Sequence, residues 1–357
     1  MSALTTCDVL VVGLGPAGAS AAAVAARAGL RVIAIDRKRE AGVPVQCAEF
    51  VPPMCGAAPA VLAHARRQEV AAMSTVIESG APYTSPDFRG LMLDRAAFDA
   101  ALAAEAEAAG ADCRFGNILK ELQPDGTAIL GDGRRLDCKV IVGADGPRSL
   151  VGRAIGCENR EMVETRQITV PLAKPHAATD VFLSTAYPGG YAWLFPKGQA
   201  ANLGVGVSPA WRHRLKRLLN ELHERMLAQG RLGASVVATT GGAIPVGGMV
   251  KSHGEIGKTL ILLAGDAAGL TNPVTGAGIS AAVLSGQMAG AAAVRQVQEA
   301  RNVGAIFQTD LEDLFGSALT RALKRRSELL RCYAEGRAPA PSELARGWIA
   351  FPEYWAA

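Results

Sequence analysis

The chain has 357 residues, of which 49% are hydrophobic and 20% charged, and its formal net charge is +4. This length permits a large buried core in two domains or in one large α/β unit, and the composition is typical of a soluble globular protein. The mild charge and the lack of a dense Lys/Arg tract argue against a dedicated nucleic-acid-binding protein.

The cysteine and histidine patterns argue against a metal site. The seven cysteines contain no C-x-x-C pair, which favours neither a disulfide framework nor a structural zinc site and fits a reducing cytoplasm. The five histidines show no ligand spacing. We therefore expect no metal and, because no basic segment precedes the first apolar run, no signal peptide.

Two nearly uncharged runs, residues 9–26 and 276–294, are long enough to raise the question of a membrane span. Gly, Ala and Ser dominate both runs, so we expect buried helices of an α/β fold. Aromatic residues near the C-terminus leave two readings open, packing against the protein body, which we favour, or peripheral membrane contact; they are Trp348, Phe351, Tyr354 and Trp355. The expected location is the cytoplasm, with peripheral contact at a membrane left open.

The first chemical motif is a G-x-G-x-x-G turn between a predicted strand, residues 9–12, and an Ala-rich helix that runs to about Ala28. A second strand, residues 30–35, ends at Asp36, and Arg37 follows. Glycines at such a turn let the backbone approach a pyrophosphate at the helix N-terminus, and the acid can accept a hydrogen bond from a ribose hydroxyl. The pattern predicts a dinucleotide site for NAD or FAD. The turn contributes Gly13, Gly15, Pro16, Ala17 and Gly18.

Residues 40–90 are predicted to be largely irregular, because prolines interrupt them repeatedly. They contain the segment Pro44-Val45-Gln46-Cys47-Ala48-Glu49 and one predicted helix, residues 60–67. Arg95 then precedes an amphipathic helix over residues 96–109. Three short strands follow, and Asp-Gly turns separate the later ones, which predicts a β-meander; they lie near residues 113–115, 128–130 and 135–139.

A further strand, residues 140–142, runs into a turn that carries Asp145. From about residue 161 to residue 209 strand-like alternation dominates, which predicts a β-rich insertion. The insertion contains Tyr191-Ala192-Trp193-Leu194-Phe195-Pro196, whose three aromatic residues alternate and therefore share one strand face. A helix over residues 211–229 and a returning strand over residues 236–244 are predicted next.

The stretch from Leu260 to Gly278 combines three features of a cofactor site. An apolar strand, residues 260–264, stops at Gly265-Asp266 and gives way to a loop of small residues. A long Ala-rich helix then begins, and helices are predicted over residues 279–299 and 303–337. A strand, a turn with one carboxylate and a helix N-terminus together can hold a polar cofactor against backbone N–H groups. The helix start contains Gly276, Ala277, Gly278 and Ile279.

Taken together, the three strand-turn signals at residues 13–36, 143–149 and 265–278 match the FAD pattern shared by aromatic-ring hydroxylases and their relatives. With the segments Pro44–Cys47, Tyr191–Pro196 and Asn272–Gly276, the chain resembles the geranylgeranyl reductase family of FAD-dependent oxidoreductases, over nearly all of its length to about Arg331. The resemblance implies an α/β fold: a Rossmann-type FAD-binding domain with a β-meander, and an inserted β-rich (α+β) substrate domain. The implied FAD-binding domain spans residues 1–155 and 245–335, the substrate domain 156–244 and a C-terminal tail 336–357.

The resemblance also implies residue roles. The first glycine turn would receive the FAD pyrophosphate, and Asp36 with Arg37 would hold the adenosine ribose. Arg95 would reach the phosphates or the ribityl chain, Gly265 and Asp266 the FAD hydroxyls, and residues 276–279 the N1–C2=O edge of the reduced flavin. Asp145 would support the cofactor, and Cys47 with Ala48 would lie near the isoalloxazine. The implied catalytic residues are Cys47, Tyr191, Trp193 and Phe195.

The implied activity is reduction of C=C bonds of a prenyl or similar apolar substrate, by hydride transfer from N5 of the reduced flavin. Two alternatives stay open: an FAD-dependent monooxygenase that hydroxylates a small molecule or a peptide side chain, and a non-catalytic flavoprotein that binds a lipid or a partner protein. The electron donor is NAD(P)H, another reductant, or a reductase or ferredoxin-like partner. Individual residues also have alternatives: an inert buried thiol for Cys47, a proton donor for Glu49, and a purely structural core for the three alternating aromatic residues.

Overall fold

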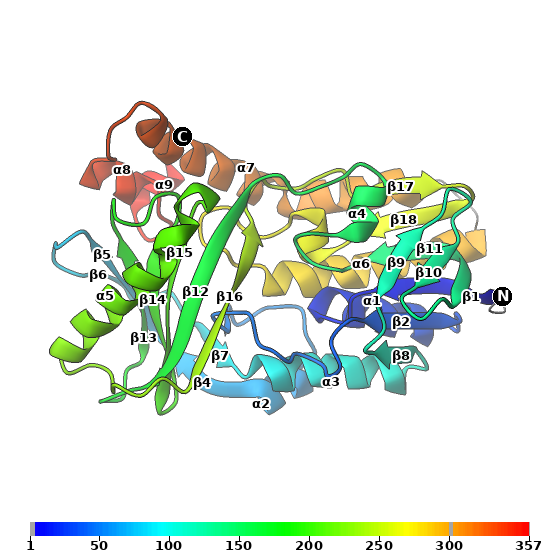
Figure 1. The fold of residues 1–357 in the computed structure, drawn as a ribbon, viewed down its shortest axis with the longest axis horizontal. Helices are drawn as coiled ribbons and strands as arrows, with labels where there is room; N and C mark the ends of the chain where they lie inside the picture. The colour runs from blue at the N-terminus through cyan, green and yellow to red at the C-terminus, as the bar shows by residue number, and fades with distance from the viewer. Residues whose placement is uncertain (1–3, 300–302, 357) are drawn as a thin grey trace.

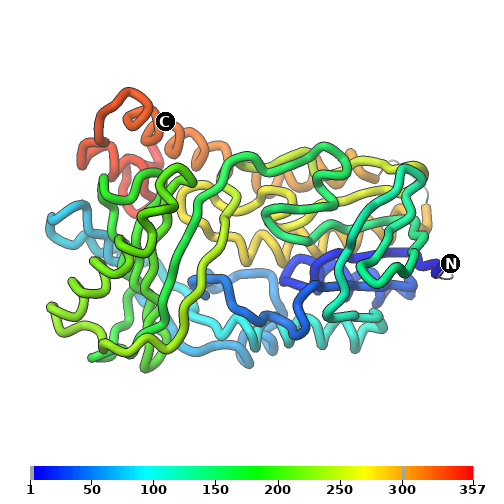
Figure 2. Tube along the Cα trace, viewed as in Figure 1, coloured from blue at the N-terminus to red at the C-terminus, as the bar shows by residue number. Residues whose placement is uncertain are grey.

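The computed structural model describes residues 4–299 and 303–356, and it consists of two lobes that are each built on one large sheet (Figure 1). Strand β1 lies in the first lobe, whereas the C-terminal helices α8 and α9 lie beside the sheet of the second lobe (Figure 2). The α/β fold class is confirmed.

The first lobe contains an eight-stranded sheet in the order β17-β18-β11-β1-β2-β8, with β10 paired to β11 and β9 paired to β10. Strands β18, β11, β1, β2 and β8 are parallel, and their apolar runs are largely buried, as expected for a sheet covered on both faces. The strands are β1 Leu4–Val12, β2 Val32–Asp36, β8 Asp112–Phe115, β9 Leu119–Leu122, β10 Ala128–Leu130, β11 Arg135–Gly143, β17 His253–Ile256 and β18 Thr259–Leu263.

A β-meander is present, but it consists of β9, β10 and β11, which pair antiparallel in sequence. The strand predicted near residues 113–115 as its first member is β8, which instead pairs parallel with β2 at the edge of the sheet. Strand β9 was not predicted. The two strands predicted over residues 135–139 and 140–142 are one strand, β11, because its pairing with β1 continues through both segments.

Five helices pack around this sheet: α1 Pro16–Arg27, α3 Arg95–Ala108, α4 Leu150–Ala154, α6 Ile279–Glu299 and α7 Val303–Ala334. Helix α1 packs against α3 and α6, and α7 packs against α6 and the strands β17 and β18. The uncharged runs at residues 9–26 and 276–294 fall mainly in β1 with α1 and in α6. No helix in the described part of the chain has both the length and the apolar character needed to cross a membrane.

The second lobe contains a seven-stranded sheet in the order β16-β12-β15-β14-β13-β5-β6. Helix α5, Leu215–Ala228, buries its leucine stripe against one face, and the 3-10 helix η1, Pro209–Arg214, takes the place of the first turn of the helix predicted from residue 211. The other face is aromatic and packs against helix α8, Pro341–Arg346, and the segment that leads to α9, Pro352–Trp355. The strands are β5 Ala72–Ile77, β6 Tyr83–Ser85, β12 Met162–Pro171, β13 Ala178–Leu183, β14 Ala192–Lys197, β15 Ala200–Val207 and β16 Ala238–Pro245.

The prediction of a largely irregular segment over residues 40–90 is wrong. Strands β3 Phe50–Val51, β4 Arg66–Val70 and β7 Gly90–Leu93 form a three-stranded sheet, and helix α2, Pro59–Ala65, ends where β4 begins. Strands β5 and β6 extend the second lobe's sheet, with β5 parallel to β13 and Ala72 opposite Ala178. Such a distant partner leaves no local signal in the sequence.

Two glycines of α6 permit its close approach to α1. A Cβ atom on Gly286 would lie 2.1 Å from the carbonyl oxygen of Ala17, and one on Gly290 would lie 2.6 Å from that of Ala21. These contacts advance in the same direction along both helices, so α1 and α6 run parallel. Their N-termini consequently lie near the same edge of the sheet.

We predict that Gly286→Ala lowers the free energy of unfolding by about 1–3 kcal/mol, because the methyl group forces the two helices apart. The matched control is Gly316→Ala in α7, where an added Cβ meets no atom within 4 Å. That change should be neutral or stabilising by up to about 1 kcal/mol, as Ala favours helix. Denaturant unfolding followed by circular dichroism measures both, and equal effects would contradict the packing argument.

Candidate active site

The site lies where β1, β2, β11 and β18 end and where α1 and α6 begin. Because these strands are parallel, their carboxyl ends meet at one edge of the sheet. Backbone N–H groups in the first turn of a helix have no partner within the helix, so two N-termini at this edge offer donors to an anionic or carbonyl oxygen.

The first turn has room for a ligand. A Cβ on Gly13, where φ is +97°, would lie 2.3 Å from the carbonyl oxygen of Ala144, and one on Gly18 would lie 1.7 Å from that of Gly13. Packing therefore requires both of these glycines. A Cβ on Gly15 meets no atom within 4 Å, so open space lies at this N-cap of α1. A phosphate group fits this requirement for close backbone approach. Pro16 opens α1, and Ala17 is buried.

Asp36 joins the two turns at the ends of β1 and β2. Its Oδ2 accepts a hydrogen bond from the Leu14 N–H at 2.8 Å, and its Oδ1 accepts one from the Lys38 N–H at 2.8 Å. Each carboxylate oxygen has further lone-pair capacity, which suits a ribose hydroxyl. Arg37 is exposed at the turn that follows.

Asp145 caps a helix. Its carboxylate accepts hydrogen bonds from the Ser149 hydroxyl and from the N–H groups of Leu150 and Val151, at the start of α4. Burial raises the pKa of this carboxyl, and these hydrogen bonds oppose the rise. The residue thus shapes the turn after β11. Its role in supporting the cofactor stays a prediction.

Arg95 begins α3 and carries a fixed positive charge into the site. Its guanidinium lies 2.9 Å from the Asp99 carboxylate, and the side chain is only 15% exposed. Burial opposes the charge, but Asp99 and Cys47 more than offset it and raise the pKa of Arg95. Cys47, whose Sγ accepts from the Glu49 N–H at 3.2 Å, therefore lies beside a cation.

The end of β18 is tied to the start of α6. The Gly265 N–H donates to Ser285 Oγ at 2.9 Å, and Thr271 Oγ1 donates to Asp266 Oδ1 at 2.6 Å. Burial raises the pKa of the Asp266 carboxyl, and the hydrogen bond from Thr271 and the charge of Arg95 oppose the rise. A Cβ on Gly278 would lie 3.2 Å from Asp266 Oδ1, so this carboxylate lies at the N-terminus of α6.

The loop before α6 holds itself in shape. Asn272 Oδ1 accepts from the N–H groups of Val274 and Thr275 at 3.0 Å, and the Asn272 N–H donates to the carbonyl of Ala277 at 2.9 Å. Gly276 adopts φ of +69°, which favours glycine. The loop thereby leaves the N–H groups of Gly278 and Ile279 for a ligand, since neither has an intrahelical acceptor.

A polar network joins residues 47–49 to the second lobe. Gln167 Nε2 donates to the carbonyl of Cys47 at 3.0 Å and Trp193 Nε1 donates to Gln167 Oε1 at 3.0 Å, while Asn202 Nδ2 donates to the carbonyl of Ala48 at 3.2 Å. The sequence pattern of β12 and β15 does not predict that Gln167 and Asn202 are buried and hydrogen-bonded, because a polar residue on a strand usually faces solvent.

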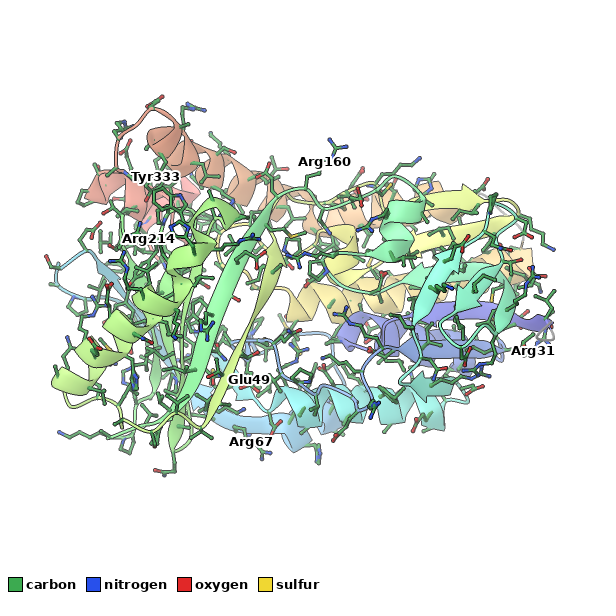
Figure 3. All side chains as sticks on the ribbon, viewed as in Figure 1. Arg31, Glu49, Arg67, Arg160, Arg214 and Tyr333 are labelled. Carbon is green, nitrogen blue, oxygen red and sulfur yellow. The ribbon has the colours of Figure 1, made fainter. Side chains whose placement is uncertain are left out.

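Glu49 lies at the centre of this network, between the lobes, where Figure 3 labels it. It is 3% exposed with φ of +71°, and its carboxylate accepts from Lys197 Nζ at 2.7 and 2.8 Å, from Asn202 Nδ2 at 2.8 Å and from the Arg95 N–H at 2.9 Å. A carboxylate with this set of donors acts as an acceptor. The alternative role of proton donor is therefore disfavoured, and Glu49 is a structural link.

The three alternating aromatic residues share one face, as predicted. Ring centroids are 5.7 Å apart for Tyr191 and Trp193 and 6.5 Å apart for Trp193 and Phe195. The Tyr191 hydroxyl donates to the carbonyl of Thr275 at 2.6 Å, which connects this face to the loop before α6. Trp348 lies 4.8 Å from Tyr191, so the C-terminal segment covers the face.

The C-terminal aromatic residues mostly pack against the body of the protein. Trp348 and Tyr354 are 3% and 2% exposed, and Phe351 contacts Tyr83 at 4.8 Å between ring centroids. Trp355 is 57% exposed. Packing against the body, the favoured reading of the sequence, is confirmed for the first three. Among the described residues no cluster of His, Cys, Asp and Glu has the geometry to hold a metal ion.

Comparisons with known proteins agree with this geometry. A family model described as an FAD binding domain matches residues 6–290. Digeranylgeranylglycerophospholipid reductase 1 of Methanopyrus kandleri is 34% identical over 320 residues, which are 82% of this chain and 81% of that protein. The digeranylgeranylglycerophospholipid reductase of Methanocaldococcus jannaschii is 30% identical over 314 residues, which are 82% of this chain and 78% of that protein.

Solved structures share the fold. A geranylgeranyl bacteriochlorophyll reductase-like protein from Thermoplasma acidophilum has a TM-score of 0.81 and 25% identity, with 99% of this chain and 98% of that chain covered. PqsL, a probable FAD-dependent monooxygenase from Pseudomonas aeruginosa, has a TM-score of 0.70 and 18% identity, with 96% of this chain and 99% of that chain covered. The second likeness concerns the fold alone.

We predict that Gly15→Ala weakens FAD binding by about tenfold or more, because the methyl group occupies the space that a phosphate needs at the α1 N-cap. The thermal stability of the FAD-free protein should stay unchanged, since the backbone at Gly15 suits Ala. Gly316→Ala in α7, where an added Cβ likewise meets no atom within 4 Å, is the control and should bind FAD normally. Calorimetric titration with FAD decides, and undiminished affinity of the Gly15 variant would exclude phosphate contact there.

We predict that Glu49→Gln destabilises the protein by about 1–3 kcal/mol, because Lys197 and Asn202 lose a charged acceptor in a buried setting. Glu69→Gln, which removes an exposed ion pair with Arg66, should cost less than about 0.5 kcal/mol. Urea unfolding compares the two variants. A loss no larger for Glu49 than for Glu69 would mean that the network does not hold the lobes together.

Proposed function

Because this chain belongs to the geranylgeranyl reductase family of FAD-dependent oxidoreductases, we propose that it reduces C=C bonds of a prenyl or similarly apolar substrate. One observation supports placing an apolar substrate beside the flavin. The aromatic face of β14 is hydrogen-bonded, through Tyr191, to the loop that opens α6, so an apolar surface adjoins the expected flavin edge.

The residues fit FAD at both ends of the cofactor. Open space at Gly15 and the acceptor at Asp36 suit a pyrophosphate and a ribose, and the N-terminus of α6 suits the electron-rich edge of the ring. When bound and reduced, FAD supplies a hydride to one alkene carbon, and the other carbon takes a proton. We propose that Gly278 and Ile279 donate backbone hydrogen bonds to the edge that gains negative charge.

The remaining work of the protein is to orient the alkene and to exclude water. Trp193 and Phe195, both buried, present rings that a prenyl chain contacts through dispersion and apolar burial. Burial and Cys47 raise the pKa of the Tyr191 phenol, so it stays protonated at neutral pH and keeps its hydrogen bond to Thr275. The implied place of Cys47 near the flavin ring remains part of this proposal.

The names of the relatives point to a glycerophospholipid with geranylgeranyl chains as a substrate class. We propose a lipid of this kind for the chain. The electron donor is proposed to be a nicotinamide nucleotide or a reductase or ferredoxin-like protein.

We predict that the FAD-loaded protein, given a chemical reductant and geranylgeraniol or a digeranylgeranyl glycerophospholipid without oxygen, yields products heavier by two hydrogens per reduced double bond. Product mass spectrometry makes the measurement. Trp211→Phe, at an exposed position on η1, serves as a control with unchanged turnover. Addition of an oxygen atom in air, with no hydrogenation without it, would favour the monooxygenase alternative.

A further inference from the structure

A small cavity of about 50 Å³ lies behind Tyr191, where α7, the α8 region and the loop after β13 meet. Its walls combine aliphatic and aromatic side chains and include Leu183, Val274, Leu329 and Leu330. Tyr333, labelled in Figure 3, lines it from α7. A cavity of this size holds a few water molecules or one small polar group.

Two buried N–H groups on the lining residues have no hydrogen-bond acceptor. Arg326 is 8% exposed and its Nε has no partner; Trp348 is 3% exposed and its Nε1 has none. Both residues line this cavity. Buried donors are nearly always paired, because an unmade hydrogen bond inside a protein costs free energy. Two such donors on one cavity indicate an acceptor that occupies it.

The charge of Arg326 strengthens the case for an anion. Its Nη1 donates to the carbonyl of Gly189 at 2.7 Å and lies 3.5 Å from that of Pro273, and the guanidinium forms no ion pair with any residue in the described ranges. Burial lowers the pKa of Arg326 to about 10, with Glu161 opposing, so the group is still charged at neutral pH. A buried guanidinium without a carboxylate partner is costly unless an anion joins it.

We propose that this cavity binds an oxyanion, a phosphate or a carboxylate group, through Arg326 Nε and Trp348 Nε1. The inference rests on the proposed function in one respect: the anion is the head group of the apolar substrate, whose chain continues past Tyr191 toward Trp193. Tyr191 lines the cavity and its ring lies 5.7 Å from that of Trp193 between centroids, so the cavity adjoins the aromatic face. A free anion is the other source of the same chemistry.

The test is calorimetric titration of the FAD-loaded protein with geranylgeranyl phosphate, geranylgeraniol and inorganic phosphate. The phosphate ester should bind at least about tenfold more tightly than the alcohol, and Arg326→Gln should abolish this preference. Trp348→Phe keeps a ring and removes the N–H, so it should weaken the ester about threefold or more and leave the alcohol unchanged. Arg331→Gln and Trp211→Phe, at exposed positions, should bind like the wild type.

Each outcome decides. Inorganic phosphate binding that depends on Arg326 supports an oxyanion site filled by a free anion, whereas binding of the ester alone supports the head group. Equal affinity for ester and alcohol, with no phosphate binding and no effect of either variant, overturns the site and leaves water as the occupant. If Arg326→Gln does not fold, Trp348→Phe decides by itself.

The proposed function is tested separately in the same samples. Reduction of geranylgeraniol by the wild type upholds the reductase activity even when the ester shows no advantage. Conversely, an Arg326-dependent phosphate signal without reduction of any prenyl compound upholds the site and rejects the activity.

Discussion

The close approach of α1 and α6 is the constraint on which the geometry of the site depends. Gly286 and Gly290 leave no room for a side chain against the backbone of α1, so the two helices run parallel at short distance. We propose that their N-termini serve one cofactor, with the open N-cap at Gly15 for a phosphate and the start of α6 for the ring edge. In this proposal the pyrophosphate and the ring edge of FAD bind backbone N–H donors whose positions are already fixed in the cofactor-free protein.

The second requirement is that the apolar surface keeps a fixed position relative to this cofactor edge. Two links provide it: the hydrogen bond from Tyr191 to Thr275, and the Glu49 carboxylate, which binds Lys197 and Asn202 of the second lobe and the N–H of Arg95 in the first. Because these links cross between the lobes, a change at either end alters both stability and alignment. The loop that carries Cys47 is held by the same contacts.

The sequence predicts the parts of the site that local pattern encodes. The glycine turn, Asp36 at the end of its strand and the helix start at Ile279 are each a short motif, and the alternation of Tyr191, Trp193 and Phe195 predicts their common face. Pairings between distant residues have no local signature: β5 joins β13, Glu49 meets Lys197, and Trp348 covers Tyr191. Nothing in the sequence indicates that Glu49 pairs with a cation, because Lys197 lies on another strand. The domain boundaries at residues 155 and 244 stay a prediction.

The most direct test of the account is anaerobic reoxidation of the bound flavin. The flavin is first photoreduced without oxygen, and its absorbance then reports whether it becomes oxidised again. Addition of a prenyl substrate should reoxidise the flavin without oxygen, with one double bond saturated for each flavin. A flavin that stays reduced until oxygen is admitted would contradict the assignment as a C=C reductase.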